Sequence, residues 1–244
     1  MPQTQAIQSA ACESKSQRSD RKQFRPALIV VDFQEDFCPP NGSLAVANGR
    51  DIASSVNHLL SLPFVLKVAT RDWHPPNHVS FATNHPGSKP FTSSTTITHP
   101  QNLSRSYTTT LWPDHCLQNS AGAQLVPELD TTKLDAIIDK GQNPTVEMYS
   151  AFYDPFHVSD SGLVAKLRGA NVTDVFVVGL AADFCVKATA QDAQAEGFQA
   201  YIVEEGTRPV APEKWNETKA GILTKGVQLV ALGGIELGKV KSLA

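Results

Sequence analysis

Residues 26–33 form an almost unbroken apolar run, Pro-Ala-Leu-Ile-Val-Val-Asp-Phe, that closes on an acid and an aromatic residue. A strand that is apolar on both sides, instead of alternating with polar residues, is typical of a parallel sheet covered by helices on both faces. Later segments repeat this pattern, with helix-like spacing between most of them. The predicted strands are residues 26–33, 64–70, 134–139, 174–179, 198–203 and 227–232, and the predicted helices are residues 52–60, 163–168, 183–196 and 213–224. This alternation predicts an α/β fold with a doubly wound, mostly parallel six-stranded sheet and helices on both faces.

The chain of 244 residues is long enough for one large α/β domain, expected over residues 26–244. Residues 1–25 are expected to form a disordered tail, because they are rich in Gln, Ser, Ala and charge. This tail lacks the apolar segment of a secretory signal, and its function stays open. The sequence has no apolar run close to the roughly 18 residues that suggest a membrane span.

The formal net charge of −3 does not indicate binding to nucleic acid or to an anionic membrane, and suits a small neutral substrate. The four cysteines lie far apart without a CxxC pair: Cys12, Cys38, Cys116 and Cys185. This usage predicts a reduced protein inside the cell, in the cytoplasm, with the nucleus and the peroxisome as alternatives. Whether the chain forms a homo-oligomer stays open.

Asp72 and His74 follow the second predicted strand and are separated by one residue, so both side chains can face one ion. A third ligand from a returning loop would leave coordination positions open, as in a catalytic metal site. Zinc suits mixed carboxylate and imidazole ligands, with iron and manganese as alternatives. His78 is a further candidate whose direction the sequence does not determine, and a polar loop with incidental histidines is the simpler interpretation.

The segment between Pro75 and Pro113 is long, polar and rich in Pro, Ser and Thr. It has no clear strand or helix pattern. A structureless segment of this length usually has a function of its own or forms a small lid.

Cys185 lies in the segment GLAADFCVKAT, at a predicted strand-to-helix turn. A helix N-terminus favours the thiolate, and backbone N–H groups at such a turn can stabilise an oxyanion. On its own, this cysteine is better explained as a small core residue. Asp32 and Lys140 follow the first and third predicted strands, and each alone fits a turn or a solvated strand end. Together they would supply a base for the thiol and a cation for the resulting anions.

In combination, these motifs resemble the nicotinamidases, which belong to the isochorismatase-like cysteine hydrolases. The matching segments are IVVDFQEDF with Asp32, TRDWHPPNHVSF with Asp72 and His74, WPDHC with His115, IDKG with Lys140 and GLAADFCVKAT with Cys185. They occur in the family's order over about residues 26–232. The long insertion between His74 and His115 is similar to that of yeast-type members.

The resemblance implies hydrolysis of nicotinamide to nicotinate and ammonia, a step of NAD salvage. It implies that Cys185 is the nucleophile, Asp32 the general base and Lys140 the third catalytic residue. It also implies that zinc orients the pyridine nitrogen and that an oxyanion hole follows a cis peptide bond. The implied zinc ligands are Asp72, His74 and His115, the implied oxyanion donors are Ala181 and Cys185, and the implied ring contacts are Phe37, Trp112 and Tyr149. For Tyr149, ordinary core packing explains the residue equally well. One departure is Phe184, where some bacterial members have His.

Three other functions are compatible with the motifs. A related amidase acting on carbamoyl or ureido substrates would have the thiol, acid and lysine but generally no metal ligands. A hydrolase that uses zinc-bound hydroxide would survive loss of Cys185 and fail on chelation. A non-catalytic binding protein with the same fold would need none of these residues.

Overall fold

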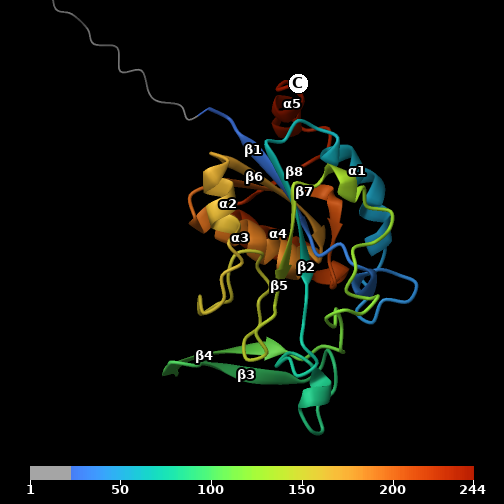
Figure 1. The fold of residues 1–244 in the computed structure, drawn as a ribbon, viewed down its shortest axis with the longest axis vertical. Coiled ribbons are helices and arrows are strands. Elements are labelled where there is room, and N and C mark those ends of the chain that lie inside the picture. The colour runs from blue at the N-terminus through green and yellow to red at the C-terminus, as the bar shows by residue number, and fades with distance from the viewer. Residues whose placement is uncertain (1–22) are drawn as a thin grey trace, which may run out of the picture.

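The computed structural model describes residues 23–244, shown in Figure 1. Most of the predicted tail lies outside the described residues. Arg25, near the start of the described part, donates a hydrogen bond to the carbonyl of Ala170, at 3.0 Å. Within residues 23–244, no helix combines the length and the apolar character that crossing a bilayer requires.

Six parallel strands form the main sheet in the order β5-β2-β1-β6-β7-β8. This confirms the predicted α/β, doubly wound fold. The strands of this sheet are β1 Pro26–Val31, β2 Leu66–Asp72, β5 Ala136–Lys140, β6 Asp174–Leu180, β7 Gln199–Arg208 and β8 Gln228–Val230. The chain moves outward from β1 through β2 to β5, and then returns to add β6 on the other side of β1. Ligands of such sheets bind at this reversal, beyond the ends of β1 and β6.

Helices pack on both faces of the sheet, and each face has its own apolar core (Figure 1). The described helices are α1 Ala53–Leu60, α2 Leu163–Gly169, α3 Lys187–Ala195, α4 Trp215–Thr224 and α5 Ile235–Lys241. On β1, Leu28 and Val30 pack into the core that includes residues of α1 and α5. Ala27, Ile29 and Val31 pack into the core that includes residues of α2, α3 and α4. The unbroken apolar run of β1 therefore follows from burial on two sides.

The segment between Pro75 and Pro113, predicted to lack secondary structure, contains an antiparallel hairpin. Its strands are β3 Ser94–His99 and β4 Asn102–Thr110, and they form a separate two-stranded sheet at one end of the molecule (Figure 1). The prediction was wrong because the strands are mainly polar, and most of their Thr and Ser side chains are exposed. The hairpin is attached to the domain through Ile97, which packs with Val146 and Phe156 in a small third core.

One helical prediction also needs correction, and one helix was not predicted. The predicted helix over residues 183–196 begins with a π-helical turn, Ala182–Val186, before α3. The last helix, α5, was not predicted, because it is short and contains only two buried apolar residues, Leu237 and Val240.

Candidate active site

Four neighbouring strands place the residues at or just after their ends at one edge of the sheet. Asp72 and Lys140 are the last residues of β2 and β5, and they are direct partners in the register of these strands. Asp32 comes directly after β1, and Cys185 lies in the π-helical turn after β6. The predicted convergence of these four side chains is therefore observed, at the point where the strand order reverses.

A buried lysine connects the carboxylates and the thiol. The Lys140 ammonium lies 2.9 Å from Asp32 Oδ2 and 3.7 Å from the sulfur of Cys185, and it also donates to Asp72. The hydroxyl of Thr70 donates to the other oxygen of Asp32, at 2.6 Å. Asp32 is 0% exposed, Lys140 2% and Cys185 6%, so water does not screen these interactions.

Burial and charge set the protonation of this cluster. Burial alone would lower the pKa of Lys140, but the carboxylates Asp32 and Asp72 raise it well above its ordinary value. Burial raises the pKa of Asp32, and Lys140 only partly opposes this. Burial would also raise the pKa of Asp72, but Lys140 and the adjacent histidines outweigh it and keep that carboxyl ionised. The lysine is thus a fixed cation beside one firmly ionised carboxylate and one with raised proton affinity.

The thiol of Cys185 is neutral at rest. Burial raises its pKa well above the ordinary value; Lys140 lowers it, and Asp32 and Asp72 raise it further. This differs from the expectation that the helix N-terminus would favour the thiolate, because burial and two carboxylates outweigh the lysine. The thiol therefore needs a base to become a nucleophile, and the sulfur and a carboxylate oxygen of Asp32 lie within 4.8 Å of each other.

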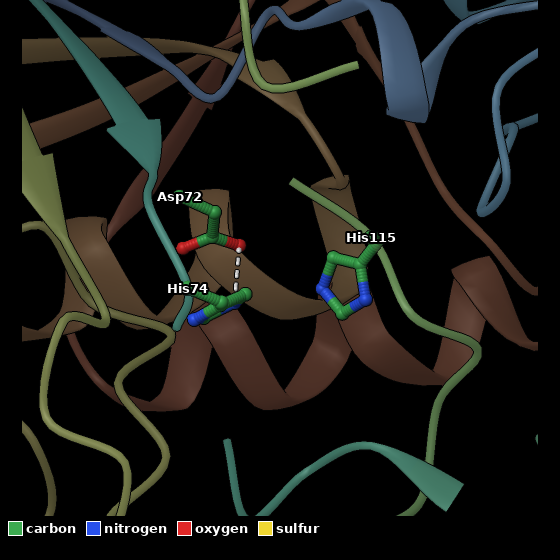
Figure 2. Close-up of side chains that lie close together, drawn as sticks. All are labelled: Asp72, His74 and His115. Carbon is green, nitrogen blue, oxygen red and sulfur yellow. Dashed lines mark ion pairs between the residues drawn. The ribbon is translucent and has the colours of Figure 1, made fainter. Parts of the chain in front are cut away.

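Asp72, His74 and His115 form a second buried cluster, whose candidate ligand atoms all lie within 4.8 Å of one another. Figure 2 shows the three side chains around a common space. Backbone carbonyls hold Nδ1 of each imidazole, at 2.7 Å from Gly141 for His74 and at 2.7 Å from Pro113 for His115. The Nε2 atom of His74 is buried without a hydrogen-bond partner. Such backbone contacts orient imidazoles for metal binding, so this donor set fits a cation.

The charge of this cluster also suits a cation. Burial opposes protonation of His74, but the Asp72 carboxylate outweighs burial and raises the pKa of the imidazole. The same negative potential would attract a metal ion. His74 Nε2 lies 3.6 Å from Asp72 Oδ2, and the dashed line in Figure 2 marks this ion pair.

His78, the undetermined candidate, has other partners for both ring nitrogens. Nδ1 lies 2.8 Å from the hydroxyl of Ser80, and Nε2 lies 3.1 Å from the carbonyl of Val146. Burial lowers the pKa of this imidazole to about 2, so the ring is neutral. It packs against His74 with ring centroids 4.1 Å apart. His78 therefore packs against the ring of His74, and other groups bind both of its ring nitrogens.

A cavity opens beside both clusters, and its lining includes residues of each. Its lining is mostly apolar and includes the polar side chains of Asp72, His115 and Glu147 and the thiol of Cys185. The lining residues are Phe37, Leu44, Val46, Asp72, Trp112, His115, Glu147, Tyr149, Ala181, Phe184, Cys185 and Val210. The three aromatic residues predicted to contact a ring are all in this wall. The peptide bond between Leu180 and Ala181 is cis, as the resemblance implied.

Several residues of the site were not predicted. Glu147 lines the cavity, and burial raises its pKa. No local motif around it indicates a function. Gln34 is buried, and its side-chain amide binds both the N–H and the carbonyl of Asp72, each at 2.8 Å. Asp183 accepts hydrogen bonds from the N–H groups of Val210 and Ala211, each at 2.9 Å. Gln34 and Asp183 lie inside the motifs around Asp32 and Cys185, which was the available signal.

Comparisons with known proteins identify the family of this chain. The family model of the isochorismatase domain matches residues 26–230. A nicotinamidase of Escherichia coli K12 is 40% identical over 187 residues, which are 75% of this chain and 83% of that protein. The crystal structure of the yeast nicotinamidase bound to the inhibitor nicotinaldehyde has a TM-score of 0.80 and 34% identity, covering 84% of this chain and 99% of that one. A pyrazinamidase of Pyrococcus horikoshii in complex with zinc has a TM-score of 0.66 and 34% identity, covering 85% and 99% of the two chains.

The fold and the site define a doubly wound α/β protein with a buried thiol, carboxylate and amine at the switch point of its sheet. The chain belongs to the isochorismatase family, and its relatives there include the nicotinamidases.

Proposed function

We propose that this chain is a nicotinamidase, which hydrolyses nicotinamide to nicotinate and ammonia. The position of the reactive groups beside the cavity supports this proposal most strongly. The thiol of Cys185 lines a cavity with aromatic walls, and the amine of Lys140 lies next to both this thiol and the carboxylate of Asp32. The similarity to several nicotinamidases, at 33–40% identity, supports the same substrate.

We further propose that Asp72, His74 and His115 bind zinc, with iron and manganese as alternatives. The orientation of both imidazoles and the partnerless Nε2 of His74 support a metal here. When bound, the ion would act as a Lewis acid that orients the pyridine nitrogen and withdraws electrons from the ring. Phe37 and Trp112 would hold the ring between them.

Acylation would follow from the geometry of the residues themselves. Asp32 takes the proton of Cys185 while the sulfur forms a bond to the amide carbon, and the carbonyl π electrons move to its oxygen. The N–H groups of Ala181 and Cys185 stabilise this oxyanion, where loss of one donor typically costs about 10²–10³ in turnover. Asp32 then donates its proton to the amide nitrogen of the substrate, and the C–N bond breaks. Ammonia departs, and the acyl group remains on Cys185 as a thioester.

Deacylation reverses the proton movements with water as the nucleophile. Asp32 takes a proton from water while the oxygen attacks the thioester carbon. The C–S bond breaks, the sulfur recovers a proton from Asp32, and the acid product becomes nicotinate by losing its carboxyl proton to solvent. Lys140 remains charged throughout, because its neighbours Asp32 and Asp72 raise its pKa.

The decisive experiment is an ammonia-release assay with nicotinamide, on the parent and on Cys185→Ala, together with metal analysis of the purified protein. We expect turnover by the parent, complete loss in the variant with its fold and metal content unchanged, and loss on chelation. Turnover by Cys185→Ala at the parent rate would refute the thiol mechanism and favour a metal-bound hydroxide. No turnover by the metal-replete parent would instead favour a related amidase with a carbamoyl substrate.

We also propose that the protein acts in the cytoplasm. The three described cysteines, Cys38, Cys116 and Cys185, are buried and free, which suits a reducing compartment.

A further inference from the structure

Two side chains of the hairpin strand β4 form hydrogen bonds with residues that line the cavity. Tyr107 and Thr109 are two residues apart and therefore point to the same side of the strand. Thr109 is buried and Tyr107 partly buried, whereas Thr108 between them is exposed. The side of β4 that faces the domain thus carries the hydroxyl groups of Tyr107 and Thr109.

Tyr107 attaches the strand to Glu147, which lines the cavity. The N–H of Glu147 donates to the Tyr107 hydroxyl at 3.0 Å, and that hydroxyl donates to the Glu147 carbonyl at 3.2 Å. One side chain thus bonds both backbone groups of a cavity residue. The packing of Ile97 on Val146 and Phe156 holds the other hairpin strand against the same segment.

Thr109 is bonded to the aromatic wall of the cavity. The indole N–H of Trp112 lies 2.9 Å from the hydroxyl oxygen of Tyr149, and Thr109 Oγ1 lies 3.0 Å from the same oxygen. An indole N–H can only donate, so the Tyr149 oxygen accepts this bond and its own proton is free for Thr109. The three side chains form one chain of hydrogen bonds, which starts from β4 and ends at the ring of Trp112.

The residues held in this way line the same cavity as Cys185. Tyr149 and Trp112 both pack against Phe184, with ring centroids 5.5 and 5.1 Å apart. The carbonyl of Met148, between the two residues that β4 binds, accepts a hydrogen bond from Lys140 at 3.1 Å. A shift of this segment would move a cavity wall and a contact of Lys140 together.

We infer that Thr109 is a positioning residue for the substrate cavity: it sets the placement of Tyr149 and Trp112, and so the affinity for an aromatic substrate. The inference rests on the proposed nicotinamidase function for its choice of substrate. It gives the hairpin a function in substrate binding, although no residue of β4 lines the cavity.

The test compares Thr109→Val with Thr108→Val, the same change at the exposed neighbour on the same strand. We expect Thr109→Val to raise KM for nicotinamide by roughly 3–10-fold, as for loss of one neutral hydrogen bond, with kcat changed less than twofold. Thr108→Val should leave both constants unchanged, and Thr109→Ser, which keeps the hydroxyl, should have a KM close to that of the parent. Equal KM values for the two valine variants would overturn the inference.

A double-mutant cycle separates positioning from a general weakening of the hairpin. If Thr109 acts through the Tyr149 hydroxyl, Thr109→Val should change KM less than twofold in a Tyr149→Phe background. The same increase in both backgrounds would mean that Thr109 acts in another way, and would refute the inference.

If the parent releases no ammonia from nicotinamide, the proposed function is refuted, but the inference about Thr109 is not. A measurement that needs no substrate then tests this inference separately. Phenacyl bromide, which is aromatic, and iodoacetamide, which is not, both alkylate thiols, and peptide mass spectrometry gives their rates at Cys185. We expect Thr109→Val to lower the ratio of the phenacyl bromide rate to the iodoacetamide rate several-fold, relative to the parent and to Thr108→Val. An unchanged ratio would overturn the positioning function independently of the substrate.

Discussion

Replacing Lys140 with methionine removes the positive charge at the centre of the site and keeps a side chain of similar length. The Lys140 side chain is 0% exposed, and its ammonium contacts Asp32 and Asp72, whose side chains are 0% and 6% exposed. Without the lysine, two buried carboxylates have no counter-charge from this position. Burial then favours their protonated forms, and the native state loses stability at neutral pH.

The expected size of this effect is large for one residue. Removing one partner of a buried ion pair costs about 3–5 kcal/mol, and Lys140 has two partners, so we expect the upper part of this range. For a domain of this size, each kcal/mol lowers the melting temperature by about 2–4 °C, which gives a decrease of roughly 8–20 °C. Nicotinamide hydrolysis should be lost as well.

The assay is thermal and urea unfolding of metal-free protein at neutral pH, because a cation on Asp72 would mask part of the effect. The double variant Asp32→Asn, Lys140→Met should recover part of the lost stability, since it removes one of the two uncompensated charges. Lys133→Met is the control, because Lys133 is largely exposed and pairs with Asp130 at 3.0 Å; its change should stay below about 1 kcal/mol. A Lys140→Met variant within about 1 kcal/mol of the parent, or no recovery in the double variant, would refute this electrostatic account.

Three further predictions concern neighbouring groups. Gln34→Leu should cost about 1–3 kcal/mol in urea unfolding, because the buried N–H and carbonyl of Asp72 lose their partner; it should also weaken zinc retention against a chelator, and parent-like retention would count against a function of Gln34 in placing Asp72. Asp183→Ala should cost about 2–4 kcal/mol and raise KM, because the backbone at Val210 loses a charged acceptor; an unchanged KM would argue that this loop does not shape the cavity. Acidification should lower kcat/KM with a midpoint above the ordinary carboxyl pKa of about 4, because burial raises the pKa of Asp32 and only its ionised form can take the thiol proton; a pH profile that falls only below about pH 4 would contradict this.

The strand pattern could be predicted from the sequence because burial on two faces leaves a local record. In β1, all side chains from Ala27 to Val31 are 0% exposed, so every position is apolar and the run is visible without any partner. The parallel order then places the residues after β1, β2, β5 and β6 at one edge, which is why the convergence of Asp32, Lys140 and Cys185 could be expected. The hairpin was not predictable in the same way, since β4 is polar and mostly exposed.

By itself, the sequence determined the α/β class, the edge of the sheet at which the site lies, and the chemical groups present there. Only the tertiary structure decided how these groups behave. The neutral state of the Cys185 thiol depends on desolvation by residues distant in the chain, and the direction of His78 depends on the Val146 carbonyl. Likewise, the bond between Thr109 and Tyr149 joins residues 40 positions apart. Periodicity records which side of an element is buried, whereas hydrogen bonds, protonation and cavity shape depend on which elements meet.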